Sequence, residues 1–368
     1  MKKLLALVLV LSLLLCGCTV QLVGPDNTPL GEVVVGPSPT PEAPQSGPVS
    51  QVEGDLMVHF LDVGQADSIL IQCDGETMLI DGGNVDDGQF IVSYLDRLGI
   101  EELDIVVNTH PHEDHVGGLA SVMAVFPTKR VLGSMNNYGT RAFDNFLHYI
   151  DQQRLELELP LANHQFTLGG AVFTVLGPVN TYPEINDMSL VLLMEYGNTT
   201  FLFTGDMEKF AEEDMLRFHE GKDLKVDVLK VGHHGSSSST GYYLLHETDP
   251  DYAVISVAAV NDYGHPHEEV ISRLEDAQIT FFRTDKLGTV IATSDGEQIV
   301  FTWDNQNADP DNVEKADSGD QVFIGNKNSK KLHTDSCSAL PKEENRVYFE
   351  SLEDALDAGY EMCGNCMG

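Results

Sequence analysis

The chain has 368 residues, of which 58 are acidic and 21 are basic, so its formal net charge at pH 7 is −37. Proteins that coat nucleic acid bind it through many Lys and Arg side chains, and a charge of this sign excludes that class. With 42% hydrophobic residues the chain can bury at least one large core, which excludes a disordered protein and a disulfide-stapled miniprotein. We expect one large catalytic domain with smaller appendages.

The first 17 residues have the pattern of an export signal. Lys2 and Lys3 precede an apolar run from Leu4 to Leu15, which is too short to span a bilayer. The sequence Leu-Cys-Gly-Cys closes this run and resembles the bacterial lipobox, which implies cleavage before Cys18 and attachment of a lipid to its sulfur. We therefore predict a signal peptide at 1–17 and an extracytoplasmic lipoprotein anchored in the cell membrane. An ordinary cleaved signal peptide is the alternative.

Residues 18–54 have no apolar periodicity, and seven prolines lie between Pro25 and Pro48. Proline-rich segments of this kind act as semi-extended spacers. We predict a tether without a functional site.

The pattern changes at Asp55. Short alternating runs predict strands at 56–63, 68–73 and 78–81, followed by a helix at 89–98 and a β-branched strand at 103–108. Directly after this last strand comes the sequence Thr-His-Pro-His-Glu-Asp-His-Val-Gly-Gly, residues 109–118. This segment holds the densest group of potential metal ligands in the chain.

Three histidines and an aspartate within six residues bury little apolar surface, so packing does not explain them. His110 and His112 lie on the same side of an extended segment and can bind one ion, whereas Asp114 and His115, at the start of a helix, can face a second. The pattern HxHxDH therefore predicts a site for two metal ions.

Two later strands end in further ligands. The apolar strand 201–204 leads to Asp206, whose carboxylate can bridge two cations, although an aspartate in this position is also a common helix N-cap. The strand 226–231 leads to His233 and His234. We expect one of them to bind the second metal ion, with His233 preferred and His234 as the alternative.

The motifs together resemble those of the metallo-β-lactamase superfamily, and more closely the hydrolase domain of ComEC-type competence proteins. They occur in order from about Asp55 to Asp304 and read HFLDVGQADS, LIDGG, THPHEDHVGGL, NDMSL, LFTGD, DVLKVGHHGS and YGHPH. The resemblance implies a four-layer αββα domain over 55–304. It also implies a hydrolase in which two divalent metal ions, Zn²⁺ or Mn²⁺, activate a hydroxide for attack on a phosphodiester.

The resemblance assigns roles to the remaining residues. Asp114 is a metal ligand and catalytic residue, and His265 or His267 donates a proton to the leaving group or binds phosphate. The alternative for these two histidines is an N-cap region before a helix at 268–277. The first metal site departs from the general superfamily pattern, because the position of its third histidine is taken by the sequence Asn-Asp-Met-Ser. Asn186, or its neighbour Asp187, is then a weak ligand or is replaced by water. Lys230 and Ser236 are expected phosphate contacts.

A polar, acidic linker at 305–321 precedes a second domain at 322–368. His333, Cys337, Cys363 and Cys366 have the spacing HxxxC and CxxC, which fits a tetrahedral zinc site. A disulfide is the alternative in an exported chain. The segment resembles the small α+β zinc-binding domain of the Ada DNA-repair protein, with His333 in place of Ada's first cysteine ligand.

These observations predict a lipid-anchored, metal-dependent hydrolase, most simply a phosphodiesterase or nuclease connected with DNA uptake or processing. The expected substrate is a phosphodiester, including DNA, and the expected membrane contact is the lipid on Cys18. The alternatives are another hydrolase of the same fold, such as a phosphocholine esterase or lactonase, and a non-catalytic binding lipoprotein of a DNA-uptake complex.

Overall fold

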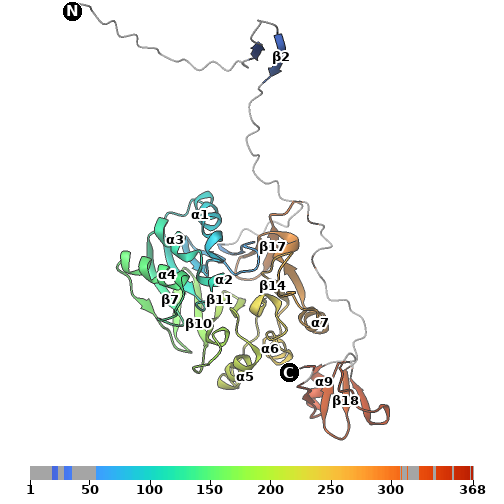
Figure 1. The fold of residues 1–368 in the computed structure, drawn as a ribbon. Helices are drawn as coiled ribbons and strands as arrows, with labels where there is room; N and C mark the ends of the chain where they lie inside the picture. Colours follow the sequence, from blue (N-terminus) through green and yellow to red (C-terminus); the bar gives the residue numbers. More distant parts are fainter. Residues whose placement is uncertain are drawn as a thin grey trace, which may run out of the picture. The chain divides into compact units, whose positions relative to one another are not determined.

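The computed structural model describes residues 19–23, 29–34, 55–306, 308, 313, 323–334, 337–349, 352–364 and 366–367 (Figure 1). The predicted signal peptide, Cys18 and most of the linker at 305–321 lie outside these residues. Within the part described, no helix is both long enough and apolar enough to cross a membrane.

Two units make up the chain, Met1–Gln45 and Ser46–Gly368. In the first, the antiparallel strands β1 (Thr19–Val23) and β2 (Pro29–Val34) pair with Thr19 opposite Val34. These two strands lie within the segment predicted to be a semi-extended tether. Their cause is local, because each arm carries β-branched valines that favour a strand.

The larger part of the second unit contains two mixed β-sheets. The first has the order β17-β16-β3-β4-β5-β6-β7-β8 and the second β15-β14-β13-β12-β11-β10-β9. The strands of the first sheet are β3 (Leu56–Phe60), β4 (Ile69–Cys73), β5 (Glu76–Ile80), β6 (Leu103–Asn108), β7 (Thr128–Gly133), β8 (Leu157–Glu158), β16 (Val290–Ser294) and β17 (Ile299–Trp303). The strands of the second are β9 (Gln165–Leu168), β10 (Ala171–Gly177), β11 (Val191–Tyr196), β12 (Thr199–Phe203), β13 (Val228–Lys230), β14 (Tyr252–Ile255) and β15 (Thr280–Arg283).

The sheets pack face to face and helices cover both outer faces (Figure 1). Alternation along β12 explains why, because Phe201 and Phe203 face the other sheet whereas Leu202 faces the helices. The first sheet is covered by α1 (Gly88–Arg97), α2 (Glu113–Val116), α3 (Leu119–Val125) and α4 (Arg141–Gln152). The second is covered by α5 (Lys209–Phe218), α6 (Tyr242–Thr248) and α7 (Glu268–Asp276), and the short α8 (Thr284–Leu287) follows β15. The predicted αββα architecture is confirmed.

The C-terminal module has its own small sheet with the order β20-β18-β19-β21. Its elements are β18 (Phe323–Asn326), β19 (Lys331–His333), β20 (Arg346–Phe349), α9 (Leu352–Asp357) and β21 (Glu361–Met362). Phe323, Leu332, Ala355 and Tyr360 are buried in it. The predicted α+β class is therefore confirmed.

Candidate metal centre

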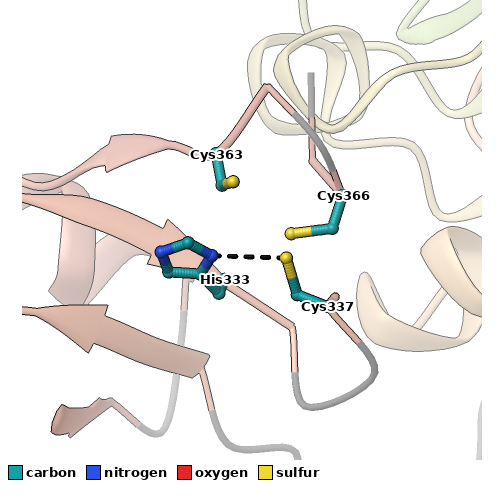
Figure 2. A group of neighbouring side chains, drawn as sticks. All are labelled: His333, Cys337, Cys363 and Cys366. Carbon is teal, nitrogen blue, oxygen red and sulfur yellow. Dashed lines mark hydrogen bonds between the residues drawn. The ribbon is translucent and has the colours of Figure 1, made fainter. Parts of the chain in front are cut away.

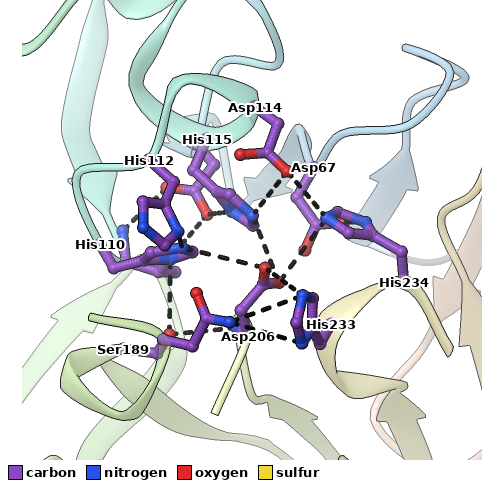
Figure 3. A network of polar contacts seen from close by, with 12 residues as sticks. Asp67, His110, His112, Asp114, His115, Ser189, Asp206, His233 and His234 are labelled. Atoms are coloured by element: carbon purple, nitrogen blue, oxygen red, sulfur yellow. Dashed lines mark hydrogen bonds and ion pairs between the residues drawn. The ribbon is translucent and has the colours of Figure 1, made fainter. Parts of the chain in front are cut away.

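The predicted ligands gather because parallel strands end at one edge of each sheet. In the first sheet β5 and β6 run parallel, and Asp81 and His110 follow their carboxyl ends. In the second sheet β12, β13 and β14 run parallel, and Asp206 and His234 follow the first two. Ligand sites in open α/β sheets form at such carboxyl ends. Here the ends of two sheets face each other across one site (Figure 3).

A close backbone contact fixes the HxHxDH segment against the loop after β5. The amide of Gly82 donates to the carbonyl of His115 at 2.6 Å, and the amide of Gly118 donates to the carbonyl of Gly82 at 3.1 Å. A Cβ on Gly118 would collide with the carbonyl oxygen of Gly82, and a Cβ on Gly82 would lie 2.6 Å from the amide of Leu119. Only glycine allows this approach, so the backbone itself determines where His115 lies.

Four side chains form the more complete cation site: Asp114, His115, Asp206 and His234 offer ligand atoms that all lie within 4.8 Å of one another. His115 Nε2 is 3.2 Å from Asp206 Oδ1, and His234 Nε2 is 3.3 Å from Asp114 Oδ2 (Figure 3). His115 Nε2, His234 Nε2 and Asp206 Oδ1 are buried without a hydrogen bond. Buried polar atoms rarely lack a partner, and imidazole and carboxylate are ligands that zinc and manganese accept. These residues fit a divalent cation.

A second group lies on the other side of Asp206. His110 Nε2 is 3.0 Å from His112 Nδ1 and 3.9 Å from Asp206 Oδ2. Asn186 lines the same cleft, and its Oδ1 is buried without a partner, whereas Asp187 accepts a hydrogen bond from the amide of Glu208. Asn186 is therefore the residue of the Asn-Asp-Met-Ser segment that fits a weak ligand, and Asp206 lies between the two groups as a bridging carboxylate would.

Buried carboxylates hold the histidines of the first group in place. Asp81 Oδ2 accepts a hydrogen bond from His115 Nδ1 at 2.9 Å, which leaves Nε2 directed at the site. Asp67 Oδ1 lies 3.4 Å from His234 Nδ1, and its Oδ2 forms an ion pair with Lys230 Nζ at 2.9 Å. Such outer partners orient the ligands of metal sites. No local sequence pattern identifies Asp67 and Asp81 as these partners, because the histidines that they hold lie far away along the chain.

The charges of the site favour a cation. Although burial opposes it, the carboxylates of Asp206 and Asp67 raise the pKa of His234 to about 10. Burial also opposes the charge on His115, but Asp206 and Asp114 raise its pKa well above the usual value. A divalent cation that binds here would replace the protons of these histidines.

Most of the candidate metal ligands line an open cleft with a volume of about 360 Å³, and Gln65, Tyr263 and His265 line the same cleft. Gln65 Oε1 accepts a hydrogen bond from the amide of Ala258 at 3.3 Å, so its Nε2 donates to His265 Nδ1 at 3.1 Å. Burial and the nearby His233 lower the pKa of His265 to about 4. His265 is therefore neutral at pH 7 and carries its proton on Nε2. The sequence offered no signal for Gln65.

The structure changes the assignment of two adjacent histidines. His233 and His234 both have left-handed backbone angles, with φ of 49° and 52°, and their ring planes are 69° apart. His234 belongs to the four-ligand group, whereas His233 Nδ1 lies 3.3 Å from both Glu208 Oε1 and Ser238 Oγ. The geometry therefore favours His234 as the ligand, which corrects the preference for His233.

Three expected substrate contacts do not reach the cleft. Lys230 is fully buried, and its Nζ is occupied by Asp67 and by the carbonyl of Val231 at 2.8 Å. Ser236 is buried and its hydroxyl pairs with that of Ser238 at 2.9 Å. His267 Nδ1 accepts from the amide of Ser237, and its Nε2 donates to the carbonyl of Tyr263. These corrections share one cause, namely that each polar group is already used in holding the fold.

The C-terminal module brings its four predicted ligands together (Figure 2). The ligand atoms of His333, Cys337, Cys363 and Cys366 lie within 4.8 Å of one another, and His333 Nδ1 is 3.3 Å from Cys337 Sγ. The three cysteines are free thiols, which argues against the disulfide alternative. Burial lowers the pKa of His333, and it raises the pKa of Cys366 to about 12. A neutral imidazole with three thiols fits a structural zinc ion.

Comparison with protein families gives two matches. The model described as the metallo-beta-lactamase superfamily matches residues 61–259, which is more than half of the chain. The model described as the metal binding domain of Ada matches residues 312–367.

Curated relatives come from several bacteria. ComE operon protein 3 of Bacillus subtilis is 29% identical over 66% of this chain and 33% of its own length. Recombination protein 2 of Haemophilus influenzae is 33% identical over 59% of this chain and 26% of its own length. The chain thus spans at most about a third of the length of these relatives. Among solved structures, the metallo-beta-lactamase fold protein YhfI from Bacillus subtilis aligns with 59% of this chain and 93% of its own, at 13% identity and a TM-score of 0.41.

Proposed function

Because the chain belongs to the metallo-beta-lactamase superfamily of metal-dependent hydrolases, we propose that it is a phosphodiesterase that acts on nucleic acid. One observation carries the proposal. The ligand atoms of Asp114, His115, Asp206 and His234 lie within 4.8 Å of one another beside an open cleft that also contains a neutral hydrogen-bond donor, His265.

Different side chains have different roles in the proposed hydrolysis. Two divalent cations, when bound, supply a nucleophilic water of lowered pKa and neutralise charge on the phosphoryl oxygens. His110, His112 and Asn186 would hold one cation, and Asp114, His115 and His234 the other, with Asp206 between them. His265 can donate a hydrogen bond from Nε2 to a phosphoryl oxygen, and Gln65 maintains the tautomer that makes this possible.

The relatives support nucleic acid as the substrate class. The Haemophilus influenzae relative is named for recombination, and a further relative, from Neisseria gonorrhoeae, is named Competence protein ComA. Competence is the uptake of DNA. Export and lipid attachment at Cys18 are part of the same proposal, and they rest on the sequence pattern of residues 1–18.

Hydrolysis assays test the activity directly. The purified full chain is incubated with bis(p-nitrophenyl) phosphate, single-stranded DNA or duplex DNA in the presence of Zn²⁺ or Mn²⁺. The His112→Ala variant is compared with His148→Ala, a matched change of an exposed histidine on α4. We expect metal-dependent cleavage that is lost only in His112→Ala. If two metal ions bind and no phosphodiester is cleaved, the proposal fails, and phosphocholine esters and lactones become the substrates to test.

A further inference from the structure

The cleft beside the metal ligands is also lined by an exposed aromatic ring. Tyr263 lines the same cleft as Asp114, Asp206 and His234, yet its side chain is 68% exposed. The Tyr263 ring stacks on that of His265, with 5.5 Å between the centroids and 25° between the planes. One face of the ring is therefore supported by the protein, and the high exposure leaves the rest of it open to solvent.

The loop that carries this ring is held rigidly. Asn261 Oδ1 accepts hydrogen bonds from the amides of Tyr263 and His265, at 3.2 and 2.9 Å. Asn261 Nδ2 donates to the carbonyls of Ala258 and His265, at 3.1 and 2.7 Å. The carbonyl of Tyr263 accepts from His267 Nε2, as described above. A ring fixed in this way loses little conformational freedom when a ligand stacks on it.

The charges of the cleft limit how a nucleic acid can bind. No Lys or Arg is among the described residues that line it, and Lys230 is buried beneath the site. The residues that line the cleft therefore offer no ion pair to the phosphates of a strand. Stacking of a base on an aromatic side chain needs no charge and works with every base.

We propose that Tyr263, supported by His265, stacks on a nucleobase next to the scissile phosphodiester. The inference rests on the proposed function and narrows it to nucleic acid with unpaired bases. In a duplex each base is already stacked and paired, so its flat face is not free for Tyr263. Single strands or frayed ends are then the preferred substrate.

The test compares substrates with and without bases. The metal-loaded full chain is assayed for kcat and KM on a single-stranded oligonucleotide, on an abasic analogue of equal length, and on the same strand annealed to its complement. The variants are Tyr263→Ala and Tyr263→Phe, with Phe218→Ala as a matched change of a 54% exposed ring on α5.

We expect Tyr263→Ala to raise KM for the single strand roughly tenfold, the effect of losing one base stack, with little change in kcat. Tyr263→Phe and Phe218→Ala should resemble the unmodified chain, and the abasic strand should have the same KM with and without Tyr263. If Tyr263→Ala raised KM equally for the single strand and for the abasic strand, the inference would be overturned, whereas the proposed phosphodiesterase activity would stand. Failure to cleave any phosphodiester would overturn both.

Discussion

The chain contains two groups of metal ligands that are built in opposite ways. In the catalytic domain the ligands come from the ends of strands in two sheets, include carboxylates, and border an open cleft. In the C-terminal module one histidine and three cysteines come from two short segments, and no carboxylate belongs to the group.

The difference separates a reactive centre from a structural one. A structural zinc site uses all four ligand positions for protein atoms, whereas a catalytic site keeps a position for water or substrate. The catalytic ligands also need supporting groups, such as Asp81, Asp67 and Lys230, because distant parts of the chain must be aligned. The predictions below test this contrast.

The largest effect is expected from loss of the zinc site. Replacing Cys363→Ser should reduce bound zinc by one ion per chain and unfold the C-terminal module, since structural zinc contributes about 10–16 kcal/mol in small domains. Hydrogen exchange of residues 323–367 and metal analysis measure this, while hydrolysis by the catalytic domain should persist. Cys73→Ala, which removes a thiol from β4, serves as the control and should keep the zinc. If Cys363→Ser abolished hydrolysis and Cys73→Ala did not, the C-terminal zinc site would not be purely structural, and the contrast between the two sites would be contradicted.

The next effect concerns the buried ion pair below the catalytic site. Lys230→Met leaves Asp67 charged and buried, and removal of one partner of such a pair costs about 3–5 kcal/mol. Urea denaturation should record this loss of the free energy of unfolding. Lys225→Met breaks an exposed pair with Asp249 and should cost less than about 1 kcal/mol. Equal values for the two variants would contradict a supporting role for Lys230.

Asp114 distinguishes a hydrolase from a binding protein. Its side chain is 31% exposed, so Asp114→Asn should leave the thermal unfolding midpoint nearly unchanged. Turnover should fall by about 10²–10³-fold, the typical cost of losing one charge-stabilising group. Parallel measurements of kcat, bound metal and the melting curve test this expectation. Retained turnover would favour the non-catalytic alternative.

The two sites should also differ in how the protonation of their histidines makes metal affinity depend on pH. His234 has a pKa of about 10, so below that pH a cation must displace its proton, and this proton alone should lower the affinity about tenfold for each unit that the pH decreases. His115, whose pKa is also raised, should add to this fall. His333 has a lowered pKa, is neutral at pH 7 and contributes no such dependence. Calorimetry in two buffers of different ionisation enthalpy counts the protons released. We expect one fewer in His234→Gln, and an unchanged count would refute the assignment of this proton.

Local motifs explain which parts of the molecule could be predicted. Four of the predicted features each lie within a few consecutive residues, namely the strands at 103–108 and 201–204, the HxHxDH turn and the CxxC turn. The sequence pattern that predicts each of them is therefore contained in one short segment. Alternating apolar residues likewise predicted a strand at 56–63, where β3 lies. The motifs supplied most of the candidate ligands, and their resemblance to the metallo-β-lactamase superfamily implied the fold class.

The features that could not be predicted from the sequence depend on contacts between residues that lie far apart in the chain or on backbone conformation. The choice between His233 and His234 depends on two left-handed backbone conformations, which the letters alone do not reveal. The burial of Lys230 depends on Asp67, which is distant in sequence, and the role of Gln65 depends on His265 in the same way. Ser236 and His267 looked available because their hydrogen-bond partners appear only in the folded chain.

The glycine contact between the loop after β5 and the HxHxDH segment has a consequence for how the protein can evolve. Because Gly82 and Gly118 touch through their backbones, no side chain can be added there without moving His115. The Tyr263 side chain has no such restriction, since it is largely exposed to solvent. Substrate preference can therefore diverge through substitutions at this position while the metal-binding chemistry is inherited unchanged.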